Sequence, residues 1–194
     1  MNYVILVLGW SIFYSLHSVL AASKLKKILT RKWPNAYKWY RLAYTIISLI
    51  LLVGILFQAL SIPKTILIPK SDLTNYLSYL FAGFGTIISM KSIKGYSLKN
   101  FLGFDPLSKE GETLTTTGLY AKVRHPLYLG LILIFLGYFL FSGTLSSAVH
   151  LICLLIYLPF GIYFEEKNLV AQYGEAYQKY QSDVPPLFPR MKSK

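Results

Sequence analysis

Five stretches of mostly apolar residues constrain the fold of this chain more than any other feature. They cover residues 3–22, 42–62, 73–93, 127–141 and 145–164. A helix of about 20 mostly apolar residues crosses the hydrocarbon core of a bilayer, and slightly fewer suffice where flanking side chains snorkel. We therefore expect an all-α integral membrane protein with five transmembrane helices. Only Ser142, Gly143 and Thr144 separate the last two stretches, which predicts a tight antiparallel hairpin.

The composition argues against several other classes of protein. Hydrophobic residues make up 54 % of the chain and charged residues 14 %, whereas a soluble domain has about 25 % charged residues. That deficit argues against a disordered chain and against an ordinary soluble domain. The single cysteine, Cys153, excludes an internal disulfide and a multi-cysteine metal site.

The basic residues predict how the helices are oriented. The formal net charge is +12, and of the 20 Lys and Arg residues only Lys64 and Lys70 lie between the second and third stretches. The others follow the first, third or fifth stretch, except for Lys91, which lies at the end of the third. Because cytoplasmic loops are enriched in Lys and Arg, we expect the N-terminus outside and the C-terminus in the cytoplasm. The same rule explains the positive charge without a nucleic-acid partner. The first stretch has its positive charges after it, so we interpret it as an uncleaved span.

The polar segments divide the chain into two regions. Residues 1–93 form an N-terminal region with three spans and a basic cytoplasmic loop, and residues 94–194 form a core around the last hairpin. Two polar segments, 94–126 and 165–189, flank that hairpin and are too long and too patterned to be mere connectors. Since both ends of a hairpin lie on one side of the membrane, these segments are expected to meet and to form a cytoplasmic site.

Arg124, His125 and Pro126 stand at the start of the fourth span. Proline is favoured in the first turn of a helix, where the backbone N–H has no helical partner. Arg124 and His125 are therefore expected at the membrane surface, at the positive end of the helix dipole, where a carboxylate or a phosphate binds readily. The alternative is a membrane anchor in which Arg124 snorkels to the surface.

Glu165 and Glu166 are expected directly at the cytoplasmic end of the fifth span. Two carboxylates there oppose the helix dipole and lie against the hydrocarbon boundary, where ionised groups are costly. A cationic partner would stabilise them. That partner is either Arg124, in a structural ion pair, or a positively charged ligand, and we favour the ligand. His17, inside the first span, is a further candidate, although a neutral histidine can equally bond to a neighbouring helix.

The order and spacing of these motifs resemble a known family of membrane enzymes. The motifs are Gly118-Leu119-Tyr120, Arg124-His125-Pro126-x-Tyr128-x-Gly130, Glu165-Glu166-x2-Leu169, Tyr173-Gly174-x2-Tyr177-x2-Tyr180 and Val184-Pro185-x3-Pro189. Together they resemble the isoprenylcysteine carboxyl methyltransferase superfamily of integral membrane methyltransferases. Within it, the chain looks most like the branch of methanethiol S-methyltransferases and NnrU-type proteins. The resemblance implies a multi-pass protein of the bacterial inner membrane.

The resemblance also implies S-adenosylmethionine as the methyl donor. Residues implied to bind this cofactor are Glu112, Thr113, Leu114, Thr115, Tyr120, His125, Pro126, Leu127, Tyr128, Glu165, Leu169, Tyr173 and Tyr177. Arg124, His125 and Glu166 are the implied catalytic residues. Methyl transfer requires alignment, exclusion of water and a deprotonated acceptor. Either His125 or Glu166 could handle that proton.

The acceptor is predicted from a departure from the family pattern. Prenylcysteine methyltransferases place an arginine about one turn before the Glu pair, whereas Gly161, Ile162 and Tyr163 occupy that turn here. We therefore expect a small thiol such as methanethiol, with His17 as a candidate on the substrate side. A lipid or a prenylcysteine carboxylate is the alternative acceptor, and membrane lipids are the expected partners.

Two other functions compete with methyl transfer. Sterol-type reductases have a similar Arg-His-Pro-x-Tyr element but bind NADPH, and a Gly-Glu commonly follows their tyrosine where this chain has Leu129-Gly130-Leu131. A non-catalytic membrane accessory protein is the third possibility. The intact Arg-His-Pro and Glu-Glu elements argue against it, because a relic need not retain charges at the membrane edge.

Overall fold

The computed structural model describes residues 1–93 and 113–189, and every regular element in those two ranges is helical. The helices are α1 (Asn2–Ala21), α2 (Ser23–Lys32), α3 (Pro34–Leu60), α4 (Asp72–Ile93), the short 3-10 helix η1 (Gly118–Ala121), α6 (Pro126–Ser142), α7 (Leu145–Tyr173) and α8 (Glu175–Asp183). The expected all-α fold class is confirmed.

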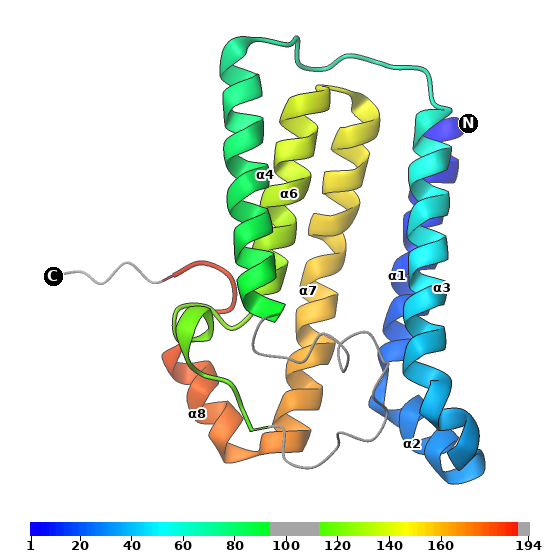
Figure 1. Ribbon diagram of the computed structural model, residues 1–194, viewed down its shortest axis with the longest axis vertical. Helices are drawn as coiled ribbons and strands as arrows, with labels where there is room; N and C mark the ends of the chain where they lie inside the picture. Colours follow the sequence, from blue (N-terminus) through cyan, green and yellow to red (C-terminus); the bar gives the residue numbers. More distant parts are fainter. Residues whose placement is uncertain (94–112, 190–194) are drawn as a thin grey trace, which may run out of the picture.

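The long helices form two groups that run along a common direction (Figure 1). α4, α6 and α7 make one group, with α4 packed on α6 and α6 on α7. α1 and α3 make the other group, and α2 joins them at one end of the molecule. α1 also packs against α7, which connects the two groups. α8 lies at the end of α7 opposite the α6–α7 hairpin (Figure 1).

Three helices of the described chain are long and apolar enough to cross a bilayer. Their apolar segments are Asn2–Leu20, Leu42–Leu60 and Leu145–Tyr173. α6 is apolar but has only 17 residues, and α4 is less apolar than the others. The five-span topology therefore stays a prediction.

The fifth apolar stretch is longer as a helix than the sequence indicated. α7 continues through Glu165 and Glu166 to Tyr173 and ends at Gly174, whose φ of 58° is readily adopted only by glycine. Placing the two carboxylates at the C-terminal end of the helix was therefore wrong. They lie about two turns before that end, so the helix dipole has little influence on them.

The hairpin between α6 and α7 is as tight as expected. Gly143 takes the left-handed conformation with φ 63°, and Thr144 caps α7 in a capping box with Ser147. The chain between α3 and α4 packs against this hairpin: the N–H of Leu67 donates to the carbonyl of Gly143 over 2.7 Å, and the N–H of Leu145 to that of Thr65 over 2.9 Å. These bonds hold the hairpin against the segment that connects α3 to α4.

Glycines allow α4 and α6 to approach closely. A Cβ atom on Gly130 of α6 would lie 2.3 Å from Ser89 Oγ and 2.8 Å from the carbonyl oxygen of Gly85 on α4. A Cβ on Gly137 would lie 2.8 Å from the carbonyl oxygen of Ser78. These backbone contacts fix the start of α6, and with it Arg124 and His125, relative to α4.

Substituting Gly130 should test this contact. We expect Gly130→Ala to lower stability by about 1–3 kcal/mol, because the added methyl group must displace backbone atoms in a well-packed interface. Gly83→Ala on α4 is the matched control, since a Cβ there meets no atom within 4 Å. Thermal unfolding in detergent measures both. Equal unfolding temperatures for the two variants would contradict the close approach.

Candidate active site

The start of α6 is held by the end of the described chain. His125 is the N-cap residue of α6 and Pro126 occupies its first turn, as the sequence predicted. The N–H groups of Arg124 and His125 donate to the carbonyls of Pro185 and Pro186, each over 2.9 Å. The segment after α8 therefore runs along the residues that precede α6.

Glu166 is almost fully engaged by protein groups. Its Oε1 accepts hydrogen bonds from Arg124 Nε over 2.7 Å and from His125 Nε2 over 3.0 Å, and its Oε2 accepts one from Gln181 Nε2 over 2.9 Å. Arg124 Nη1 also donates to the carbonyls of Gln181 and Val184. With its side chain 16 % exposed, Glu166 ties α7, the start of α6 and α8 together.

Glu165 has a different environment from its neighbour. Its side chain is 44 % exposed, and its Oε2 lies 3.5 Å from His125 Nδ1. The Tyr128 hydroxyl also hydrogen-bonds to this carboxylate. Each of the two glutamates thus fits a different interpretation. Glu166 forms the structural ion pair with Arg124, whereas the Glu165 carboxylate is exposed and could contact a positively charged ligand.

His125 lies between the two carboxylates. Its side chain is only 3 % exposed, and its ring stacks on that of Tyr128 with centroids 5.4 Å apart. Burial alone would lower the pKa of His125, but hydrogen bonds and charge attraction from Glu165 and Glu166 raise it above its ordinary value. The geometry favours an imidazolium that bridges α6 and α7.

The raised pKa of His125 predicts a pH-dependent stability. A group whose pKa is higher in the folded state stabilises the fold fully below its unfolded value of about 6.5, and this contribution disappears as the pH rises through the folded pKa. We expect the Tm difference between the wild type and His125→Gln to be largest below the unfolded-state pKa of about 6.5. The difference should shrink as the pH rises through the folded-state pKa of His125. Thermal unfolding in detergent across pH measures this. A difference that grows with pH would contradict the imidazolium.

An aromatic cluster lies between α7 and α8. Tyr177, Tyr180 and Val184 are buried, and Leu114, Leu169, Val170 and Tyr173 pack against them. Tyr177 is 1 % exposed, and its hydroxyl has no hydrogen-bond partner within the described chain. Burial, reinforced by the charge of Glu166, raises the pKa of Tyr177, which keeps the hydroxyl protonated. The cluster thus offers apolar surface and one unused donor.

The structure brings together most of the residues expected at the cofactor. His125, Tyr128 and Glu165 form one contact group, and Leu114, Leu169, Tyr173 and Tyr177 form the other. Pro126 is buried, while Leu127 and Thr115 are half-buried and Thr113 is exposed. Glu112 lies outside the described residues.

Two tyrosines fix η1 beside the cluster. The Tyr180 hydroxyl donates to the carbonyl of Tyr120 over 2.6 Å, and the Tyr120 hydroxyl donates to the carbonyl of Ser92 over 3.4 Å. Tyr120 therefore connects α8 to the end of α4. Its expected role at the cofactor stays a prediction.

His17 contacts a neighbouring helix. The Tyr44 hydroxyl lies 2.8 Å from His17 Nε2, and Ser48 Oγ lies 3.4 Å from Nδ1, both on α3. One residue further along α1, Ser18 Oγ lies 3.0 Å from the Tyr157 hydroxyl of α7. The contacts of His17 lie within the group of α1 and α3, and the Ser18–Tyr157 contact crosses to the other helix group. A substrate role for His17 stays a prediction.

Gln181 is the residue of this site that sequence reasoning missed. It hydrogen-bonds through its side chain to Glu166 and through its carbonyl to Arg124. Its position depends on the turn at Gly174, where the chain changes direction between α7 and α8 (Figure 1). A lone glutamine on a short polar helix gives no signal of that contact. Tyr180, by contrast, lies within the tyrosine motif.

Comparison with known proteins identifies a family and relatives of this chain. A family profile described as phospholipid methyltransferase matches residues 73–176. Methanethiol S-methyltransferase 2 of Bradyrhizobium diazoefficiens is 30 % identical over 93 % of this chain and 71 % of that protein. Methanethiol S-methyltransferase of Crocosphaera subtropica is 30 % identical over 92 % of this chain and 71 % of that protein. Protein-S-isoprenylcysteine O-methyltransferase of Schizosaccharomyces pombe is 38 % identical over 39 % of this chain and 34 % of that protein. No solved structure matches the chain significantly.

Proposed function

The chain belongs to the phospholipid methyltransferase family and is a methyltransferase, and on that premise we propose that it transfers a methyl group from S-adenosylmethionine to a small thiol such as methanethiol. The accessible Glu165 carboxylate beside the Leu169–Tyr173–Tyr177 surface is the observation that supports this proposal most. The names of the two relatives that align over most of the chain support the choice of acceptor.

The residues present fit the chemical groups of S-adenosylmethionine. Glu165 would take the ammonium group or the ribose hydroxyls, since it is the carboxylate of the Glu pair that remains accessible. Leu169 and Tyr173 would cover the adenine, and the unused Tyr177 hydroxyl would donate to an acceptor of the cofactor. The cofactor's carboxylate would lie at the start of α6, where the first N–H groups of the helix point outward. When bound, the cofactor supplies the electrophilic methyl group.

Arg124 and Glu166 are proposed to act as positioning residues. The sequence placed them among the catalytic residues, but Arg124 already donates to Glu166 and to two carbonyls. They hold His125 and the segment after α8 in place. Between the two residues considered for the acceptor's proton, we favour His125 in its neutral form, because both oxygens of Glu166 accept hydrogen bonds from protein groups. The imidazolium form of His125 has no lone pair for that proton. A thiol has an ordinary pKa of about 8.5, so modest assistance is enough to deprotonate it.

We further propose that α4 and α6 cross the bilayer together with α1, α3 and α7. α6 runs beside α7 along its apolar length, and α4 runs beside α6 (Figure 1), so a membrane around α7 surrounds them as well. With the N-terminus outside, Glu165 and α8 face the cytoplasm of a bacterial cell. A reporter fused after Lys194 should then read cytoplasmic. A reading on the opposite side would contradict the five-span topology.

Calorimetry on detergent-purified protein tests the function, with S-adenosylhomocysteine and NADPH titrated separately. We expect micromolar binding of S-adenosylhomocysteine alone, followed by methylation of methanethiol when S-adenosylmethionine is supplied. Binding of NADPH alone would favour the sterol-type reductase. If neither bound to folded protein, the chain would be a non-catalytic accessory protein.

A lipid or a prenylcysteine carboxylate is the second candidate acceptor. The relative from Schizosaccharomyces pombe favours a prenylcysteine. The turn before the Glu pair disfavours it, because Gly161 there is buried against the Tyr157 ring and neither Ile162 nor Tyr163 supplies a positive charge. Methyl transfer to methanethiol and to a prenylcysteine, measured side by side, distinguishes the two acceptors.

A further inference from the structure

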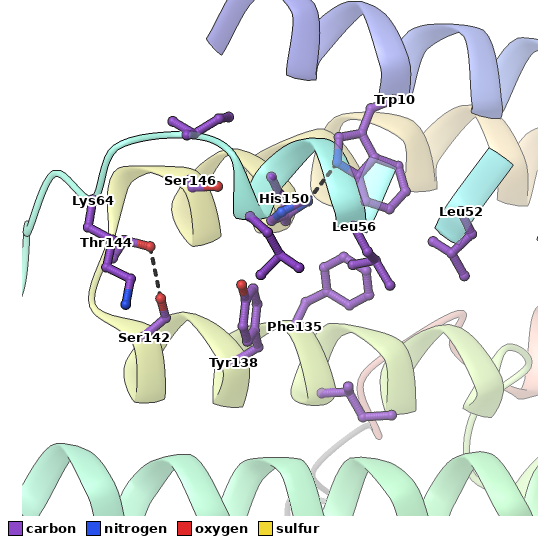
Figure 2. A pocket seen from close by; sticks show the side chains of 14 residues that line it. Trp10, Leu52, Leu56, Lys64, Phe135, Tyr138, Ser142, Thr144, Ser146 and His150 are labelled. Atoms are coloured by element: carbon purple, nitrogen blue, oxygen red, sulfur yellow. Dashed lines mark hydrogen bonds between the residues drawn. The ribbon is translucent and has the colours of Figure 1, made fainter. Parts of the chain in front are cut away.

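A pocket lies at the other end of α6 and α7 from Glu165. It has a volume of about 430 Å³ and is lined by α1, the end of α3 and the residues after it, α6 and the start of α7, as Figure 2 shows. Ser146 at its polar end is separated from Glu165 by about 30 Å along α7, at 1.5 Å per residue. This pocket is therefore not part of the proposed methyl-transfer site.

One buried donor of this pocket has no acceptor among the residues that the structure describes. Trp10 Nε1 donates a hydrogen bond to His150 Nδ1 over 2.8 Å. Because an indole nitrogen can only donate, His150 Nδ1 is unprotonated and the ring proton lies on Nε2. His150 is 1 % exposed, and its Nε2 has no hydrogen-bond partner within the described chain. A buried donor without an acceptor is costly, so this N–H invites one from a ligand.

A second group of donors lies one turn of α7 closer to the hairpin. Ser146 precedes His150 by four residues and so shares its face of α7. Its Oγ is buried and likewise without a partner in the described ranges. Lys64 lines the same end of the pocket, and no described carboxylate lies within 4 Å of its ammonium group. The N-terminal end of α7 adds the positive end of a helix dipole.

The lining changes from polar to apolar along the pocket. Figure 2 shows Lys64 and Ser146 toward one end, His150 beside Trp10, and Leu52, Leu56 and Phe135 toward the other end. A ligand that fits this order has an anionic group, a second acceptor about one helical turn deeper, and a hydrocarbon chain beyond it. A glycerophospholipid has these three parts: its phosphate, the ester carbonyl below it and the acyl chain. A free fatty acid has a carboxylate but no second hydrogen-bond acceptor further along its chain.

We propose that this pocket binds an anionic glycerophospholipid. The phosphate lies at Lys64 and Ser146, the ester carbonyl accepts from His150 Nε2, and one acyl chain packs on Leu56 and Phe135. The lipid connects α3 to the α6–α7 hairpin, and so joins the two helix groups at the end of the molecule away from α8. This role does not depend on the identity of the methyl donor or acceptor.

Quenching of Trp10 fluorescence by brominated lipid tests the proposal. Trp33→Phe and Trp39→Phe leave Trp10 as the only tryptophan, and both replaced side chains are exposed. The protein is reconstituted into vesicles with phosphatidylglycerol or phosphatidylcholine whose acyl chains carry the same bromine atoms. We expect stronger quenching by phosphatidylglycerol. Lys64→Glu should weaken the protein's preference for phosphatidylglycerol over phosphatidylcholine about tenfold, because one charge-assisted contact is lost.

Lys70→Glu is the matched control, because it makes the same charge change between α3 and α4 but does not line the pocket. It should leave the preference unchanged. Circular dichroism and gel filtration confirm that each variant is folded. Equal quenching by the two lipids in the parent protein would overturn the proposal. Displacement of phosphatidylglycerol by an equal mole fraction of free fatty acid would overturn the assignment to a glycerophospholipid.

Discussion

Replacing Glu165 with glutamine is expected to weaken the binding of S-adenosylhomocysteine at least about tenfold, because a charge-assisted hydrogen bond contributes roughly 1.5–3 kcal/mol. Glutamine retains the size of the side chain and one acceptor oxygen but removes the negative charge. Within the described residues, the half-exposed Glu165 side chain interacts with His125 and Tyr128, so the fold should tolerate the change. Calorimetry with the purified variant measures the loss, and the rate of thiol methylation should fall with it.

Glu175→Gln is the matched control for this experiment. Glu175 is an exposed carboxylate in the first turn of α8, close in sequence to the aromatic cluster, and it forms no ion pair with another described residue. Its substitution makes the same charge change and should leave the affinity unaltered. If the two variants lost affinity equally, the effect would be a general change of charge at this end of the molecule. Glu165 would then have no specific contact with the ligand.

The local features of this fold were predictable from the sequence where one residue determines them. Pro126 has its preferred place in the first turn of α6, and Gly143 supplies the left-handed residue that a tight hairpin needs. The all-helical architecture also follows from the apolar stretches. The sequence supports the count of five spans less strongly, because α4 includes several polar residues and α6, with 17 residues, is short for a transmembrane helix.

The division of roles within the Glu pair was not predictable. Glu165 and Glu166 are adjacent in sequence, and nothing in their local pattern distinguishes them. The difference arises because consecutive residues of a helix point about 100° apart, so that Glu166 faces Arg124 and α8 while Glu165 faces Tyr128. The position of α8 in turn depends on Gly174. The sequence around the two glutamates therefore does not indicate these long-range contacts.

Arg124→Met is expected to destabilise the protein by about 3 kcal/mol, because removing one partner of a largely buried ion pair leaves the other charge uncompensated. The side chains of Arg124 and Glu166 are 10 % and 16 % exposed, so water cannot fully replace the lost contact. The segment after α8 should loosen as well, since Arg124 also binds the carbonyls of Gln181 and Val184. Thermal unfolding in detergent measures the change in stability.

A double-mutant cycle separates the ion pair from the packing of the arginine side chain. Arg124→Met combined with Glu166→Leu should be more stable than Arg124→Met alone, because the double variant leaves no unpaired carboxylate. It should remain less stable than the wild type, since His125 and Gln181 also lose their acceptor. Lys122→Met is the control, an exposed cation two residues before Arg124, and its Tm should equal that of the wild type. If the effects of Arg124→Met and Glu166→Leu were strictly additive, the two charges would not stabilise each other. The start of α6 would then be held mainly by the backbone hydrogen bonds to Pro185 and Pro186.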